Sequence, residues 1–151
     1  MNQALLLVCF LGFSSAVVLR NELDATMPST TCFHCLCLQE SGCKPIGCQE
    51  KNGNMSCGYY LISMPYYLAC GRLGYQEGED MPTAFRRCAA NYACSTQCVK
   101  NYYQSNARNC GNQKTPCEVM VRNHEGGPNG CSNNDTLPMW TSVQKCCTGQ
   151  C

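Results

Sequence analysis

The sequence predicts a small α+β fold that is mainly helical, contains a short β-hairpin and is rich in disulfides. Seventeen of its 151 residues are cysteines, a density typical of secreted domains that rely on disulfides for stability. Apolar residues recur at helical spacing in several segments. The segment from Ser56 to Met64 is instead rich in aromatic and β-branched residues, which indicates a strand or hairpin.

Residues 1–16 are typical of a signal peptide. The first thirteen residues carry no charged side chain, the run from Ala4 to Phe13 is apolar, and small residues follow up to Ala16. Arg20 ends this segment before it reaches the ~20 apolar residues that a transmembrane helix needs. We therefore expect a secreted, extracellular protein with no membrane span.

Removal of this leader would take Cys9 and leave sixteen cysteines, an even number that allows eight disulfides. A zinc site at Cys32–Cys37 would need a reducing compartment or more histidines than His34 and His124. We therefore expect no metal and no other cofactor. The formal net charge is +1 and no polybasic run occurs, so we expect no nucleic-acid partner.

The remaining chain is predicted to form one domain. Residues 17–31 are expected to be a short flexible lead-in, because Arg20 to Thr31 shows no apolar periodicity. From Cys32 to Cys151 the cysteines recur too regularly to leave room for a linker. The domain is therefore assigned to residues 32–151.

Two helical regions follow from the spacing of apolar residues and cysteines. One helix is predicted over Cys32 to Glu40, with its end fixed by Gly42. Phe85 to Tyr103 has apolar residues and cysteines at three- and four-residue steps, which predicts one helix, or two with a break near Ala93 to Thr96. Trp140, the only tryptophan, is expected in the core.

A third helix is predicted from its start signal. Thr115 and Glu118 form a capping box, and Pro116 stands at the first helical position. The helix should run through Arg122 and stop before Gly126.

A series of short motifs carries a family resemblance. The stretches CLCLQESGCKPIGC, SCGYYLI, PYYLACG, CAANYACSTQCVKNY and above all NHEGGPNGC occur in this order. Together they resemble the invertebrate-type lysozymes, the family that includes the leech destabilases. The resemblance covers Cys32 to about Cys147, and it implies a lysozyme-like fold with a cleft for the alternating amino sugars of bacterial peptidoglycan.

The same resemblance implies a disulfide pattern. The expected pairs are Cys32–Cys117, Cys37–Cys43, Cys48–Cys57, Cys70–Cys98, Cys88–Cys94 and Cys110–Cys131. Cys35 would join the C-terminal tail through Cys146 or Cys147, and Cys151 would take the cysteine left over.

The resemblance also assigns the catalytic positions. It implies that Glu40 is the general acid, and it places the family's second carboxylate where this chain has Lys51. Glycoside cleavage normally uses one protonated carboxyl group and one carboxylate, about 5–5.5 Å apart in retaining enzymes. Burial can raise the pKa of Glu40 enough for an acid. Lys51, in contrast, would repel the developing positive charge and favour the ionised form of Glu40.

Three outcomes remain open for the missing carboxylate. Glu50 could replace it, since it precedes Lys51 and lies beside the Asn52-Gly53-Asn54 turn. Glu40 could alternatively act with a water molecule held by neutral groups. Hydrolysis could also be weak or absent.

The substrate-binding residues are expected on two segments. Tyr59, Tyr60 and Ile62 match the family's cleft-lining stretch, in which Leu61 replaces a glutamine, although strand residues of these types are also common in cores. His124 precedes Gly126 and Gly127, a pair of glycines that would let the backbone approach a ligand closely. Ser56 begins the same cleft stretch. The set is Ser56, Tyr59, Tyr60, Leu61, Ile62, His124, Gly126 and Gly127.

These residues predict a lysozyme-type glycoside hydrolase that acts on β-1,4 links of peptidoglycan, in antibacterial defence or in digestion of bacteria. The first alternative is a peptidoglycan-binding, lectin-like protein with little or no catalysis. The second is an isopeptidase that uses Ser56 with His124 as its base. We expect a monomer in each case.

Two asparagines are candidate glycosylation sites. Asn54-Met55-Ser56 and Asn134-Asp135-Thr136 both fit the acceptor sequence for N-linked glycans. A glycan on Asn134 would lie in a polar loop. A glycan on Asn54 would crowd the expected cleft.

Overall fold

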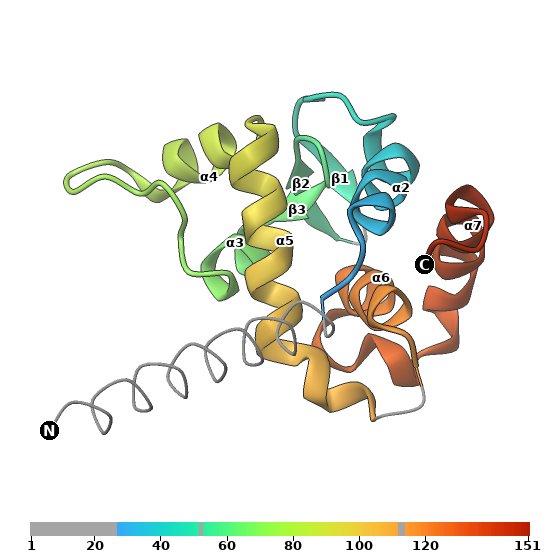
Figure 1. Cartoon of the computed structure of the whole chain (residues 1–151). Coiled ribbons are helices and arrows are strands. Elements are labelled where there is room, and N and C mark those ends of the chain that lie inside the picture. The colour runs from blue at the N-terminus through green and yellow to red at the C-terminus, as the bar shows by residue number, and fades with distance from the viewer. Residues whose placement is uncertain (1–26, 52, 112–113) are drawn as a thin grey trace, which may run out of the picture.

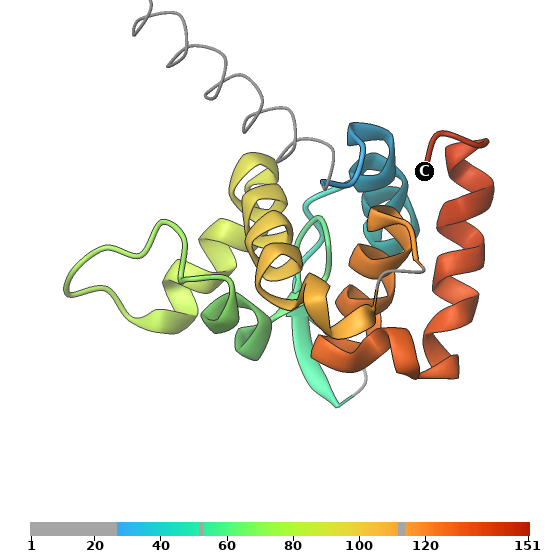
Figure 2. The ribbon, with the colours of Figure 1, turned by 60° about the horizontal axis from the view of Figure 1, so that its bottom comes forward.

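The structure is a computed structural model and describes residues 27–51, 53–111 and 114–151. Helix α5 (Tyr92–Asn106) runs through the middle of the domain (Figure 1). On one side of it lie α3 (Met64–Ala69) and α4 (Met81–Ala89), and on the other lie α2 (Thr30–Ser41), α6 (Pro116–Gly126) and α7 (Leu137–Cys147). The turned view in Figure 2 shows the same division.

A small antiparallel sheet completes the fold. Its strands are β1 (Gln49–Lys51), β2 (Asn54–Cys57) and β3 (Ile62–Ser63), in the order β1-β2-β3. Lys51 is the register partner of Asn54, and Ser56 is the partner of both Gln49 and Ser63. The predicted class, a mainly helical α+β fold with a short hairpin and many disulfides, is therefore confirmed.

The helices predicted from caps lie close to their expected positions. Helix α2 ends at Gly42, which adopts the left-handed conformation with a φ of 68°. It begins before Cys32, however, because the Ser29 side chain accepts the N–H of Cys32 and caps the helix. Thr115 caps α6 through the N–H of Glu118, as predicted. Residues 1–16 and the lead-in up to residue 26 lie outside the described residues.

Four details of the expected elements need correction. The helical region from Phe85 to Tyr103 is two helices, and the break falls at residues 90–91, before the expected position. The cause is Asn91, whose side chain accepts the N–H of Cys94 and starts α5. The strand or hairpin expected over Ser56 to Met64 is a hairpin of β2 and β3, and it ends at Ser63, which caps α3.

The other two corrections are smaller. Strand β1 was not predicted, and α6 continues to Gly126, the residue before which it was expected to stop. Trp140 is 9% exposed and packs in the core, as expected. None of the helices in the described part of the chain is long and apolar enough to cross a membrane.

Disulfides join the helices that carry the site. Cys32–Cys117 links α2 to α6, and Cys35–Cys146 links α2 to α7. The other six are Cys37–Cys43, Cys48–Cys57, Cys70–Cys98, Cys88–Cys94, Cys110–Cys131 and Cys147–Cys151. They match the pairs that the resemblance implies, and the open choice is decided in favour of Cys146 as the partner of Cys35.

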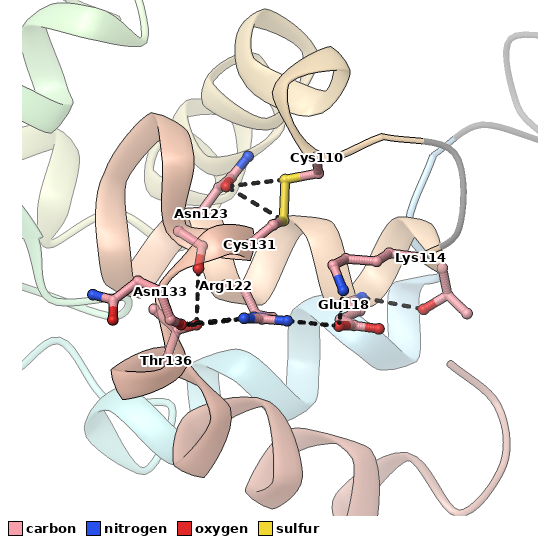
Figure 3. Close-up of polar contacts among 10 residues, drawn as sticks. Cys110, Lys114, Glu118, Arg122, Asn123, Cys131, Asn133 and Thr136 are labelled. Carbon is pink, nitrogen blue, oxygen red and sulfur yellow. Dashed lines mark hydrogen bonds and ion pairs between the residues drawn. A yellow bond between two sulfur atoms is a disulfide. The ribbon is translucent and has the colours of Figure 1, made fainter.

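A buried polar network holds the segment that follows α6, as Figure 3 shows. Arg122 is 4% exposed and donates hydrogen bonds to Thr136 Oγ1 at 2.9 Å and to the Asn133 carbonyl at 3.1 Å. It also forms an ion pair with Glu118 at 3.0 Å. A buried arginine keeps its charge at low cost only when its donors are satisfied. The 3-10 turns η2 (Gly127–Ser132) and η3 (Asn134–Thr136) are thereby fixed against α6.

Candidate active site

An open cavity lies between the sheet and the C-terminal end of α6. The sheet and the start of α3 supply one wall, and the last turn of α6 supplies the other. The lining residues are Lys51, Asn54, Ser56, Leu61, Ser63, Tyr66, His124 and Glu125. The polar groups of two distant segments therefore converge on one open space, as is typical of ligand sites.

Glu40 does not line the cavity, but it contacts Lys51, which does. It occupies the last turn of α2, and its side chain is only 1% exposed. The Lys51 ammonium nitrogen lies 2.8 Å from each of its carboxylate oxygens, and His124 Nε2 lies 3.6 Å from Oε1. Lys51, whose side chain is 24% exposed, thus separates Glu40 from the cavity.

A second carboxylate reaches the same ammonium group. Glu125, in the last turn of α6, accepts a hydrogen bond from Lys51 Nζ at 2.9 Å. The nitrogen is 2.8 Å from Glu40 Oε2, so the two carboxylate oxygens are at most 5.7 Å apart. Two acidic side chains that are 85 positions apart in sequence therefore flank one cation.

Burial and the ion pairs act in opposite directions on Glu40. Burial raises the pKa of the Glu40 carboxyl group from 4.5 to about 7, although the Lys51 ammonium opposes the rise. For Lys51, burial by itself would lower the pKa, but Glu40 and Glu125 outweigh it and raise the pKa above 10.5. Glu40 can therefore hold a proton near neutral pH beside a lysine that stays charged.

His124 is a neutral, fixed side chain. Its Nε2–H donates to the Tyr60 carbonyl at 2.9 Å, so Nδ1 is unprotonated and accepts from the Tyr66 hydroxyl at 3.1 Å. Burial, together with the nearby Lys51 charge, lowers the pKa of His124 to about 4. Both ring nitrogens are engaged, so this imidazole is poorly placed to take a proton from Ser56.

Some residues of the predicted cleft-lining stretch line the cavity, and others are buried in the core. Ser56 and Leu61 line the cavity, whereas Tyr60 and Ile62 are at most 1% exposed and belong to the core. Tyr59 is half-buried and contacts the Tyr92 ring edge-on. Among the aromatic positions expected to bind substrate, none lines the cavity in this structure.

The two glycines after His124 have packing roles. A β-carbon on Gly126 would lie 2.6 Å from Thr136 Cγ2, so the close approach of η3 requires glycine there. Gly127 has a φ of 76°, which side chains rarely adopt. Neither glycine is among the residues that line the cavity.

Glu50 lies apart from the site. It is exposed on β1, next to Lys51, and successive strand residues point to opposite faces of a sheet. Lys51 faces Glu40, so Glu50 is directed away from it, and Glu50 does not line the cavity. Of the two glycosylation candidates, Asn54 lines the cavity, whereas Asn134 is exposed at the start of η3.

A metal site has little support in the described residues. The sulfur atoms of Cys32, Cys117 and Cys151 lie within 4.8 Å of one another. All three are bonded in disulfides, and a metal requires the free thiolate.

Three residues of the site escaped the sequence-based selection. Ser63 and Tyr66 line the cavity, but Ser63 was considered only as part of the predicted strand or hairpin, and Tyr66 only as part of the family motif PYYLACG. Glu125 also lines the cavity, but it was considered only as part of the family motif NHEGGPNGC. The available signal was its position beside His124, combined with the positive charge at Lys51 that calls for an acidic neighbour.

Comparisons with known proteins agree with this geometry. The family model described as Destabilase matches residues 29–146. Invertebrate-type lysozyme 2 of Caenorhabditis elegans is 46% identical over 136 residues, which cover 89% of this chain and 97% of the relative. Invertebrate-type lysozyme 3 of the same organism is 48% identical over 120 residues, or 79% of this chain and 86% of the relative.

A solved structure supports the same assignment. The crystal structure of the lysozyme of Tapes japonica is 39% identical, with a TM-score of 0.67, over 79% of this chain and 90% of that one. Sequence and fold agree along nearly the whole described chain. The chain therefore belongs to the Destabilase family, together with the invertebrate-type lysozymes, and is a lysozyme-type enzyme.

Proposed function

We propose that this protein is a secreted, extracellular hydrolase that cleaves β-1,4 glycosidic bonds of bacterial peptidoglycan, with Glu40 as the general acid. Such an activity serves antibacterial defence or the digestion of bacteria. The observation that carries the proposal is the burial of Glu40 beside an open polar cavity, with its pKa raised to about 7. A general acid is most effective when its pKa lies near the working pH.

The position of Glu40 fits this role. Burial keeps a large share of the carboxyl group protonated near neutral pH, in the form that donates to the glycosidic oxygen. The neutral His124, 3.6 Å away, adds no positive charge that would stabilise the ionised form. The rim of the cavity offers hydroxyl and amide groups of Asn54, Ser56 and Ser63 to a polar sugar.

One observation favours the lectin-like alternative. Lys51 covers Glu40, and a substrate can reach the acid only after the ammonium group moves. If it did not move, the cavity would still bind glycan without cleaving it. An isopeptidase gains no such support, because both ring nitrogens of His124 are already engaged.

Incubation with purified peptidoglycan tests the proposal. We expect the wild type to release new reducing ends and Glu40→Gln to release none. The wild type and Glu40→Gln should both sediment with the insoluble glycan. Glu77→Gln is the matched control, since Glu77 is exposed in a loop away from the cavity. Retention on the glycan without release would establish the lectin-like alternative, and cleavage of a γ-glutamyl-lysine amide would establish the isopeptidase.

A further inference from the structure

We propose that Glu125 is the second catalytic carboxylate of this site, and that Lys51 occupies the place between Glu125 and Glu40 where the reacting sugar carbon must lie. The inference rests on the proposed hydrolase function and adds a residue to it. Glu125 belongs to α6, whereas the family resemblance places the second carboxylate on the β-hairpin, at the position of Lys51. The catalytic pair would thus combine Glu40 of α2 with a residue of α6 instead of a residue of the hairpin.

The spacing of the two carboxylates supports this assignment. Their oxygens are at most 5.7 Å apart, because each lies within 2.9 Å of the same nitrogen. Retaining glycosidases keep their two carboxyl groups about 5–5.5 Å apart, while inverting enzymes need about 6.5–9.5 Å to admit a water molecule. This upper limit is compatible with the spacing of a retaining pair and lies below the spacing that an inverting enzyme needs.

The location of Lys51 is the second support. Its ammonium carries a full positive charge between the two carboxylates, which raise its pKa. The transition state of glycoside cleavage also carries positive charge, at the anomeric carbon and ring oxygen. In the free protein, the Lys51 ammonium group therefore occupies the position in which the oxocarbenium-like transition state would lie.

Exposure distinguishes the roles of the two acids. The Glu40 side chain is 1% exposed and the Glu125 side chain is 19% exposed. The more buried group is suited to hold a proton, and the more exposed one, which also lines the cavity, is suited to contact the sugar. Glu50, the other carboxylate near Lys51 in sequence, lies outside the cavity.

The chemical step balances with these two groups and one water. Glu40 gives its proton to the glycosidic oxygen as the bond from that oxygen to the anomeric carbon breaks. A Glu125 oxygen attacks the same carbon and forms an ester. Water then attacks the carbon, its proton passes to the Glu40 carboxylate, and the ester oxygen returns to Glu125 as a carboxylate. The product keeps the configuration of the substrate.

The step requires Lys51 to swing aside. Its long side chain is partly exposed at the cavity wall, so it can turn outward without disturbing the core. Protonation of Glu40 removes one of its two ionic partners and makes this movement easier. Lys51 thereby limits the rate of hydrolysis. Lys51→Gln should raise that rate about tenfold, an effect that requires only a small decrease in the activation free energy.

The decisive comparison uses the Lys51→Gln background. If Glu125 served only to hold Lys51, then adding Glu125→Gln to Lys51→Gln would change nothing. If Glu125 is the second carboxylate, the double variant should lose on the order of a hundredfold or more in kcat, the usual effect of removing a group that stabilises transition-state charge. Peptidoglycan binding and circular dichroism should match those of Lys51→Gln, which excludes misfolding.

The outcomes separate the two proposals. Equal rates in Lys51→Gln and the double variant would overturn the role of Glu125 and leave the hydrolase standing. Absence of hydrolysis in the wild type and in Lys51→Gln would overturn both. The initial product from a soluble β-1,4-linked amino-sugar oligomer, followed by NMR, should show retained configuration, and inversion would contradict the proposal. Glu77→Gln in the same background should leave the rate unchanged.

Discussion

Lys51 Nζ lies 2.8 Å from both carboxylate oxygens of Glu40, so the residue that replaces the family's second carboxylate also covers the first. This contact limits the rise of the Glu40 pKa and also limits the access of a substrate to Glu40. Burial raises that pKa to about 7, and without the opposing lysine it would be higher still. The pH dependence of catalysis is therefore a direct test of the contact.

Hydrolysis should decline as pH rises through about 7, because Glu40 then loses the proton that it must donate. Lys51→Gln removes a charge that lowers the Glu40 pKa, so the declining limb of kcat/KM should move to higher pH. The measurement is the pH profile of reducing-end release by the wild type and by Lys51→Gln. Lys145→Gln is the control, since Lys145 is exposed near the end of α7 and lies away from the cavity. An unshifted limb in Lys51→Gln would contradict the prediction.

Glu40 and His124 should make opposite contributions to stability between about pH 4.5 and 6.5. The pKa of His124 falls from 6.5 to about 4 on folding, so its contribution is present above pH 6.5 and is lost as pH falls through 4. The pKa of Glu40 rises from 4.5 to about 7, so its contribution is present below pH 4.5 and is lost as pH rises through 7. The two effects nearly cancel in the wild type.

Replacing either Glu40 or His124 should reveal the pH-dependent contribution of the other residue to stability. Relative to the wild type, Glu40→Gln should become more stable as pH rises from 4.5 to 6.5, and His124→Gln less stable. Each slope should approach about 1.4 kcal/mol per pH unit at most. Urea unfolding at three pH values across this range measures the slopes. Slopes of the same sign in both variants would contradict the predicted opposite contributions of Glu40 and His124.

The disulfides should differ in their contribution to stability. Cys32–Cys117 closes a separation of 85 residues, and Cys147–Cys151 closes one of only 4. In the chain-entropy description, removing the first should cost about 4–5 kcal/mol and removing the second about 2 kcal/mol. Denaturant unfolding of the two paired Cys→Ser variants tests the order. A larger loss of unfolding free energy on removal of Cys147–Cys151 than on removal of Cys32–Cys117 would contradict the prediction.

We also expect no free thiol in the mature protein, because all sixteen cysteines from Cys32 onward are paired. Alkylation of the denatured, unreduced protein followed by mass spectrometry should add no label. Two or more labelled cysteines would show that a disulfide is missing.

Asn54 should remain unmodified in the secreted protein, and Asn134 should carry a glycan. Asn54 lines the cavity, so a bulky glycan there would exclude a sugar chain from the site. Asn134 is exposed on η3, where a glycan meets solvent. Peptide mass spectrometry of natively secreted material decides the occupancy. Full occupancy of Asn54 would count against the hydrolase.

The elements with local start and stop signals were predictable from the sequence. Helix α6 follows from Thr115 and Pro116, and the end of α2 follows from Gly42, because a cap depends on residues within one turn. Strand β1 was missed because Gln49, Glu50 and Lys51 show no apolar alternation. Its pairing with β2 is what makes it a strand.

The site was harder to predict than the fold. Glu40 and Lys51 were identified through the family resemblance, but the contact of Lys51 with Glu125 joins positions 74 apart in sequence. Tyr60 and Ile62 were read as cleft residues, yet the turn at residues 58–61 directs them inward. A strand pattern gives alternation but does not tell which face meets the ligand.

The Cys32–Cys117 disulfide joins the two helices that carry Glu40 and Glu125. The hairpin that carries Lys51 is closed by its own bridge, Cys48–Cys57, which does not reach either helix. The two helices are thus joined by a covalent tie that is independent of the hairpin and lies eight residues before each acid. The hairpin position can therefore accept a different side chain, and with it a different control over access to Glu40, while the helices that carry the two acids stay joined.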